Sequence, residues 1–177
     1  MSCLSKRYNK AAASSLFIFR NLLIVHLEGT DVQYIVALDK ATGKTVWKTE
    51  RPEKFYKDIL PVYRKAYITP IVVGVDGREL LISNGAQMCF AYDVMTGEPV
   101  WSVWYGYDST VAMPFAYGGL VYFNSGWIKM ENTPNFVKLF AVDPHGSGDV
   151  TKSHVKWELD TDVPQITTPV IVDGKIY

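Results

Sequence analysis

The side chains best suited to chemistry in this sequence are three histidines, and none of them stands in a recognisable catalytic or metal-binding pattern. His26 lies within an apolar run that is typical of a strand, so we expect a core or channel-lining residue rather than a ligand. His145 and His154 flank an inserted segment, HGSGDVTKSH, whose glycines and Asp149 superficially resemble a calcium loop. The alternating oxygen ligands of such loops are missing, and the segment is therefore predicted to be a plain solvated turn.

The two cysteines, Cys3 and Cys89, are too few for a disulfide framework and lack the spacing of a zinc site. The sequence also contains no Gly-x-Ser-x-Gly motif, no recognisable Ser-His-Asp arrangement and no phosphate-binding loop. We therefore predict no catalytic residue, no cofactor-binding residue and no metal ligand.

The composition is that of one globular domain with a real core, because 48% of the 177 residues are hydrophobic. Basic and acidic residues balance at 18 each, which gives no electrostatic reason to expect nucleic acid as a partner. No apolar run approaches the length that a membrane-spanning helix requires. Residues 1–13 are polar and basic, and we expect a disordered tail without a signal peptide.

Any site must be positioned by a repeat that dominates the chain. Residues 37–47 have the sequence ALDKATGKTVW, and residues 91–101 have the sequence AYDVMTGEPVW. Residues 141–157, AVDPHGSGDVTKSHVKW, keep the same beginning and end around an insertion. Successive repeats are 54 and 50 residues apart, measured between their aspartates. A period near 50 indicates a propeller or another repeat array.

Each repeat is preceded by two short apolar runs joined by a polar turn, which is a hairpin signal, so each unit contains four strands. In the first unit we predict strands over 16–19, 22–28, 33–39 and 45–49. The dipeptides Thr42-Gly43 and Thr96-Gly97 place glycine where a tight hairpin requires positive φ. The prediction is an all-β fold, a β-propeller of four-stranded antiparallel blades with an incomplete ring of about three and a half blades. The units occupy residues 14–50, 67–105, 111–160 and 166–177 of a partial propeller over 14–177.

Two segments fall outside the repeat. Residues 51–66 are predicted to form one short helical turn, with Pro52 opening it and Pro61 ending it. Residues 126–136 lengthen the connection between two strands of the third unit.

The pattern Ala-x-Asp-x-x-Thr-Gly-x-x-x-Trp resembles the tryptophan-docking motif of the quinoprotein, or PQQ-like, propellers. A small alanine would leave room for an indole from a neighbouring blade, and Asp and Thr accept hydrogen bonds from the turn's own backbone. We expect these residues to be structural. They are Ala37, Asp39, Thr42, Gly43, Trp47, Ala91, Asp93, Thr96, Gly97, Trp101, Ala141, Asp143 and Trp157.

The resemblance implies two alternative functions. BamB-like members of the family imply a non-catalytic protein-binding or scaffolding module in the bacterial periplasm or cell envelope. The PQQ-dependent dehydrogenases imply PQQ, calcium, a catalytic Asp and often a pair of adjacent cysteines, which this sequence lacks. The first alternative is favoured, without a cofactor, and a fragment of a quinoprotein dehydrogenase remains the second.

The loops between the second and third strands of each unit share a face with the connections between units. This face carries long aromatic segments, and loops on a rigid scaffold commonly bind partners. The alternative is that these aromatic side chains only pack the loops. The expected binding-face residues are Tyr67, Trp104, Tyr107, Trp127 and Gln165.

An incomplete ring is expected to leave apolar surface on the first unit and on residues 166–177. The expected partners are therefore further blades of a longer chain, a second copy of the chain, or another protein.

Overall fold

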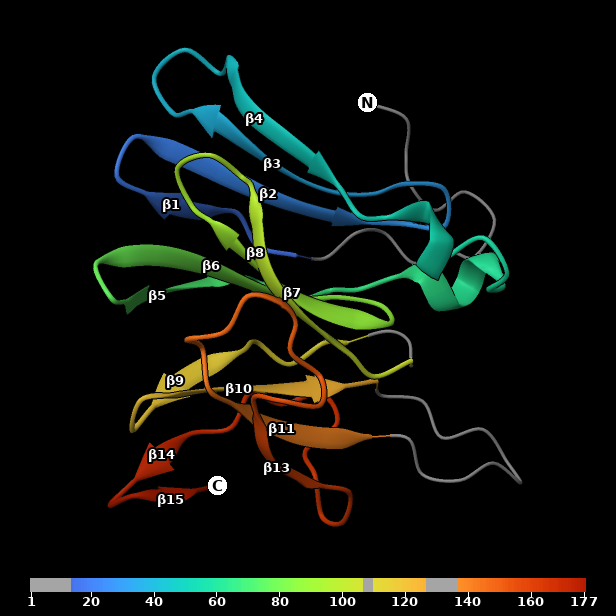
Figure 1. Cartoon of the computed structure of the whole chain (residues 1–177). Coiled ribbons are helices and arrows are strands. Elements are labelled where there is room, and N and C mark those ends of the chain that lie inside the picture. Colours follow the sequence, from blue (N-terminus) through green and yellow to red (C-terminus); the bar gives the residue numbers. More distant parts are fainter. Residues whose placement is uncertain (1–13, 107–109, 127–136) are drawn as a thin grey trace.

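The computed structural model describes residues 14–106, 110–126 and 137–177, and in these ranges the protein consists of strands joined by turns and two short 3-10 helices (Figure 1). The predicted all-β fold is therefore confirmed. The first sheet has four antiparallel strands in chain order, which are β1 (Phe17–Phe19), β2 (Leu22–Glu28), β3 (Gln33–Asp39) and β4 (Thr45–Glu50). These bounds differ from the predicted strands by at most one residue at either end.

The second and third sheets repeat this arrangement. The second contains β5 (Ile71–Val75), β6 (Arg78–Asn84), β7 (Met88–Asp93) and β8 (Pro99–Trp104). The third contains β9 (Phe115–Tyr117), β10 (Leu120–Ser125), β11 (Lys138–Val142) and β13 (Val155–Leu159). A hairpin of β14 (Ile171–Val172) and β15 (Lys175–Ile176) follows.

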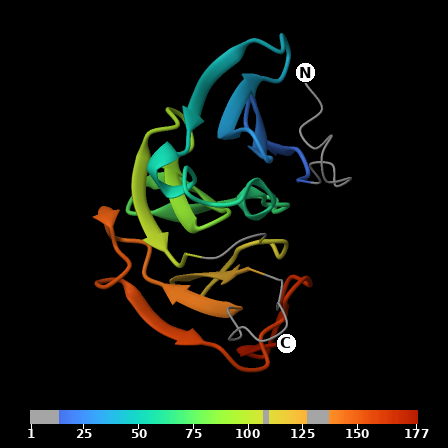
Figure 2. The same cartoon turned by 90° about the vertical axis from the view of Figure 1, so that its right-hand side faces the viewer.

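The sheets stack face to face in an open arc, with the turns between third and fourth strands at one end and the connections between sheets at the other (Figures 1 and 2). How deeply a strand is buried depends on where its sheet lies in this arc. β2 alternates between buried and half-buried residues because the described part of the chain stacks a sheet on one of its faces only. The last five residues of β6 are all buried because sheets lie on both sides.

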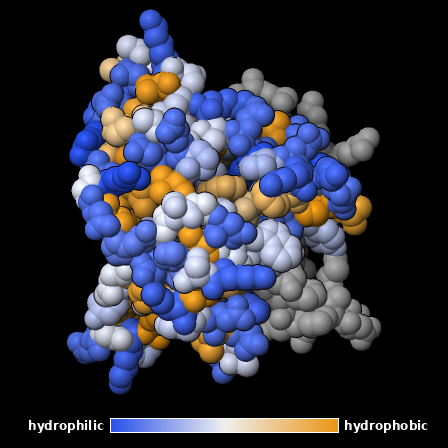
Figure 3. All heavy atoms as spheres, viewed as in Figure 1, coloured by the Kyte–Doolittle hydropathy of each residue, from blue (hydrophilic) through white to orange (hydrophobic). Residues whose placement is uncertain are grey.

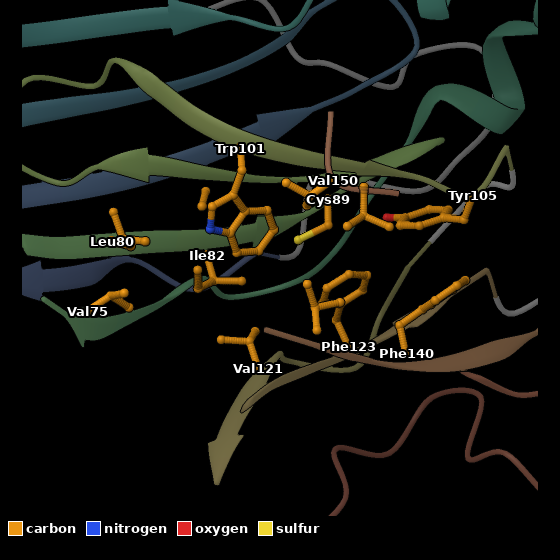
Figure 4. Packing of buried hydrophobic residues seen from close by; sticks show 13 residues of the cluster. Val75, Leu80, Ile82, Cys89, Trp101, Tyr105, Val121, Phe123, Phe140 and Val150 are labelled. Atoms are coloured by element: carbon orange, nitrogen blue, oxygen red, sulfur yellow. The ribbon is translucent and has the colours of Figure 1, made fainter. Parts of the chain in front are cut away.

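Apolar clusters fill the spaces between neighbouring sheets. The cluster between the second and third sheets includes Trp101, Tyr105 and Phe123, and Figure 4 shows these side chains converging from β8, β10 and their neighbours. The cluster between the first and second sheets includes Trp47 and Phe90. The predicted hairpin turns are also present, because Gly43 and Gly97 have φ of 71° and 75°.

The inserted segment of the third unit is not a plain solvated turn, and that prediction is wrong. Its short strand β12 (Gly148–Asp149) pairs in parallel with the outer edge of β8. The backbone N–H of Val150 donates to the carbonyl of Ser102 at 2.9 Å, and the Val150 side chain is buried in the cluster of Figure 4. The insertion joins the neighbouring sheet because it supplies both a backbone partner for this edge and an apolar side chain for the core.

The prediction of one helical turn ending at Pro61 is also wrong. The segment forms two 3-10 helices, η1 (Glu53–Phe55) and η2 (Pro61–Arg64), and Pro61 begins the second. The fixed φ of proline and its missing N–H suit the first position of a helix, where no intrahelical donor is needed. The predicted loop over residues 126–136 falls almost entirely outside the described residues.

Candidate functional site

The motif aspartates hold the turns of the first two repeats. Asp39 Oδ1 accepts from the backbone N–H of Thr42 at 2.8 Å, and Asp93 Oδ1 accepts from that of Thr96 at 2.9 Å. The Thr42 hydroxyl donates to the same Asp39 oxygen, and these hydrogen bonds lower the pKa of Asp39. Because these oxygens are engaged within their own turns, the described turns give them a local structural role.

The first two motif tryptophans connect consecutive sheets. The indole N–H of Trp47 donates to the carbonyl of Val94 at 3.1 Å, and that of Trp101 donates to the carbonyl of Pro144 at 3.0 Å. Both rings are buried, and Trp101 is only 1% exposed. Each ring therefore combines a large buried apolar area with a satisfied donor.

The motif alanines lie differently from the sequence prediction. Each alanine is the cross-strand neighbour of the tryptophan in its own sheet, rather than making room for an indole from the neighbouring one. The pairs are Ala37 with Trp47, Ala91 with Trp101 and Ala141 with Trp157. In all three sheets, the pairing register of the third and fourth strands shifts directly after the alanine. Such a shift is typical of a β-bulge, which bends the strand that carries the extra residue.

The third repeat departs from the other two. Asp143 Oδ1 lies 2.6 Å from Nδ1 of His145, and Lys156 Nζ lies 3.1 Å from Asp143 Oδ2. These contacts lower the pKa of Asp143 and raise the pKa of His145. Trp157 is 40% exposed and packs beside Tyr122, with ring centroids 5.7 Å apart.

Among the predicted binding-face residues that the structure describes, Trp104 alone lines a groove. Tyr67 is half-buried, and its backbone N–H donates to Thr110; Gln165 is exposed. Trp104 is 52% exposed and lines a groove that contains neither of these two residues. Tyr107 and Trp127 lie outside the described residues.

The groove lies on the outer side of the second sheet and encloses about 720 Å³. Met88 and Phe90 are buried at its base, and Phe55 and Trp104 line it from η1 and from the end of β8. The inserted segment borders it through residues 148–152. In Figure 3, apolar side chains gather over the region of β7 and β8, among hydrophilic ones. Such a recess on a rigid sheet suits the binding of an apolar side chain.

A buried polar cluster, formed by His26, Glu28 and Arg51, lies directly behind the groove. Glu28 Oε1 contacts Nε of Arg51 and lies 3.0 Å from Nε2 of His26. Glu28 Oε2 accepts from the backbone N–H of Ala86 at 2.8 Å. All three charged or titratable side chains are inaccessible to solvent. The cluster therefore joins the first sheet and the connection after it to the β6–β7 loop of the second sheet.

Arg51 also holds the base of the groove in place. Its guanidinium donates to the carbonyls of Met88 at 3.0 Å and Ser83 at 2.8 Å, and it lies 5.2 Å from the centre of the Phe90 ring. Charge-assisted hydrogen bonds of this kind are stronger than neutral ones, so the base is rigidly supported.

The interactions within this cluster favour the charged forms of Glu28 and Arg51. Burial by itself would raise the pKa of Glu28, but the charges of Arg51 and His26 and the hydrogen bonds to the carboxylate bring it below its usual value. Burial opposes the charged form of Arg51, and Glu28 overcomes this and raises the pKa of Arg51.

The sequence prediction missed Glu28 and Arg51, although a signal was present. Every second residue of a strand points to the same face of the sheet. In β2 the buried face carries Leu22, Ile24 and His26, and the charged Glu28 continues this row. A buried carboxylate requires a buried cation, but the sequence does not show which one supplies it.

Other candidate chemistry is limited in the described ranges. Burial raises the pKa of the Cys89 thiol, which disfavours the reactive thiolate. Within residues 14–106, 110–126 and 137–177, no three His, Cys, Asp or Glu side chains gather into a metal-binding group. Among the same residues, no helix has the length and apolar character needed to cross a membrane.

Solved proteins with a similar fold include the following two. The first is BamB from Moraxella catarrhalis, with a TM-score of 0.57 and 17% sequence identity over 91% of this chain and 43% of that one. The second is the quinohemoprotein alcohol dehydrogenase ADHIIG from Pseudomonas putida HK5, with a TM-score of 0.53 and 16% identity over 94% of this chain and 30% of that one. The chain thus spans less than half the length of either protein.

No curated protein matches the sequence significantly. The family model described as "Outer membrane protein assembly factor BamB" matches residues 31–177, which is most of the chain. The repeats, the stacked four-stranded sheets and this match agree, and the chain belongs to the BamB-like family of PQQ-like propellers.

Proposed function

We propose that the chain is a non-catalytic, protein-binding or scaffolding module with a BamB-like role in the periplasm or cell envelope. The description of its family names an outer membrane assembly factor, and this supports an envelope role. The observation that carries the binding function is the groove beside Trp104, because an exposed tryptophan next to a rigid apolar recess is typical of residues that dominate binding energy.

The arrangement favours binding over catalysis. In the described residues, the motif aspartates Asp39, Asp93 and Asp143 are engaged by their own turns, and the buried carboxylate of Glu28 is paired with Arg51. The described residues contain no His, Cys, Asp or Glu group fit for calcium, so we derive no step through PQQ or calcium. The module is proposed to act without a cofactor.

The binding function can be tested by photo-crosslinking in cells. A Trp104→p-benzoylphenylalanine variant is compared with the same replacement at Val46, which is exposed but does not line the groove. The proposal predicts a discrete adduct with an envelope protein, identified by mass spectrometry, at position 104 alone. Equal labelling at both positions, or no adduct at Trp104, would contradict it.

The fold likeness to a quinohemoprotein dehydrogenase supports a second candidate, a piece of a quinoprotein enzyme. Adding PQQ and calcium to the purified chain distinguishes the two. Saturable PQQ absorbance changes with calcium-dependent dye reduction would favour the enzyme, and their absence together with a Trp104 adduct would favour the binding module.

Exposed apolar side chains at both ends of the arc suggest additional partners. Ile18 of β1 and Val172 of β14 are 62% and 51% exposed. We propose that further propeller blades or a second copy of the chain cover these ends, because large apolar patches promote association. Light scattering across a concentration series tests the second copy, and a concentration-independent monomer would contradict it.

A further inference from the structure

The groove is suited to binding one large apolar side chain. Its base is made by Met88 and Phe90, and Arg51 fixes that base from behind. Phe55 and Trp104 belong to different elements and line the groove above this base. The Trp104 indole packs against Gly106, where an added methyl group would lie 2.9 Å from the ring. The tryptophan is therefore exposed and also held by its neighbour.

The border of the groove carries positive charge on two elements. Lys54 comes from η1, and Lys152 comes from the inserted segment; both are exposed. The carboxylate of Asp149, on the same border, is engaged by its own turn, where Oδ1 accepts from the Thr151 backbone at 3.0 Å and from its hydroxyl at 2.6 Å. The Lys54 ammonium lies 4.9 Å from the centre of the Phe55 ring, and the charge of Lys152 contributes to the lowered pKa of Asp149. With two cations and one anion among the residues that line it, the groove has a net positive charge, which is complementary to carboxylates on a ligand.

The structure itself shows that this side of the second sheet accepts extended backbone. The inserted segment already lies along β8 as a parallel strand, and its Thr151 hydroxyl accepts from the Trp104 backbone N–H at 2.9 Å. Gly148 and Asp149 of this short strand also line the groove, and both are exposed. An extended peptide is therefore a better geometric match than a compact ligand.

We infer that the groove binds an extended acidic peptide segment, with one aromatic or large aliphatic side chain seated between Phe55 and Trp104 and carboxylates facing Lys54 and Lys152. This inference rests on the proposed protein-binding function and specifies the partner's chemistry.

Fluorescence polarisation with the whole chain tests it. The probe is a labelled peptide with one phenylalanine flanked on each side by two glutamates. One control peptide replaces the glutamates with lysines, and another replaces the phenylalanine with serine. We expect the probe to bind about tenfold more tightly than either control and to weaken with added salt.

Protein variants locate the site. We expect the Lys54→Ala/Lys152→Ala double variant to weaken probe binding about tenfold, since each exposed charge pair is worth up to about fivefold. A matched Lys44→Ala/Lys175→Ala variant, changing exposed lysines outside the groove, should leave binding unchanged. Trp104→Ala should weaken binding more than Trp104→Phe, which keeps an aromatic ring.

The outcomes separate this inference from the proposed function. Equal binding of acidic and basic peptides, or equal losses in the two double-lysine variants, would overturn the inference. If the probe fails while the crosslinker at Trp104 still captures an envelope protein, the acidic-peptide inference is wrong and the binding function stands. Failure of both experiments overturns both. Binding to phosphatidylglycerol vesicles with the same lysine dependence, and not to the peptide, would instead identify a membrane surface.

Discussion

Gly97 lies directly against the indole of Trp47, although the two residues belong to adjacent sheets. A methyl group added to Gly97 would lie 2.5 Å from Cε3 of Trp47, and the Thr49 hydroxyl donates to the Gly97 carbonyl at 2.7 Å. Gly43 occupies the same place in the first repeat, yet an added methyl group there would meet nothing within 4 Å. Equivalent glycines thus share a turn conformation, but only one of them lies at an interface between sheets.

This contrast predicts that a glycine-to-alanine substitution destabilises the protein more at Gly97 than at Gly43. Gly43→Ala should lower the free energy of unfolding by about 1–2 kcal/mol, because only the left-handed backbone conformation opposes it. Gly97→Ala should cost about 1–3 kcal/mol more, because the methyl group also overpacks the indole of Trp47. Urea denaturation of the two variants measures the difference, and equal losses would show that the sheets do not touch at Gly97.

Trp101 should be the most sensitive of the motif tryptophans. Trp101→Ala removes a ring that is 1% exposed and should cost about 3–5 kcal/mol of unfolding free energy. Trp157→Ala should cost clearly less, because that ring is 40% exposed. Thermal denaturation followed by circular dichroism provides the comparison; similar losses in midpoint temperature for the two variants would contradict the packing described for Trp101.

Removing one partner of the buried Glu28–Arg51 pair should be severely destabilising. Glu28→Gln leaves the guanidinium of Arg51 buried without its counter-charge, which typically costs about 3–5 kcal/mol. Glu50→Gln is the matched control, because its ion pair with Lys48 is exposed and the midpoint of unfolding should stay the same. Guanidinium chloride titrations distinguish the two, and comparable stability in both variants would argue against a buried pair.

The same pair predicts a particular pH dependence. The pKa of Glu28 is lower in the folded protein than its ordinary value of 4.5, so its contribution to stability is complete above about pH 4.5 and is lost as the pH falls through the folded pKa. The Glu28→Gln variant cannot lose this contribution. We therefore expect the stability difference between the two proteins to shrink as the pH is lowered from 6 to 3. A difference that stays constant over this range would mean that Glu28 does not titrate in this way.

Much of the fold could be predicted because its signals are local. The turn after β3 is fixed by hydrogen bonds between Asp39 and Thr42, three residues apart, and by a glycine that tolerates positive φ. Apolar runs of fixed length between such turns define the strands, so β1 to β4 lie within one residue of their predicted bounds. The repeat of this unit then specified the stacked sheets.

The candidate site could not be predicted because it is made by contacts between sheets. Glu28, Arg51 and the Ala86 backbone are far apart in the sequence, and the groove combines η1, β7, β8 and the insertion of the next unit. A residue pattern shows that one face of a strand is buried, but it does not show which residue of another sheet covers it.

The inserted segment shows the same division. Its glycines and polar residues are typical of a solvated turn, but part of the segment forms the strand β12. Tertiary structure decided its role, since only stacking brings Val150 to the edge of β8 and into an apolar core. Strands and turns could be located from the sequence because they depend on neighbours within a few residues. The packing of the sheets decided the buried cluster and the groove, because burial and charge pairing depend on residues that meet only after the chain has folded.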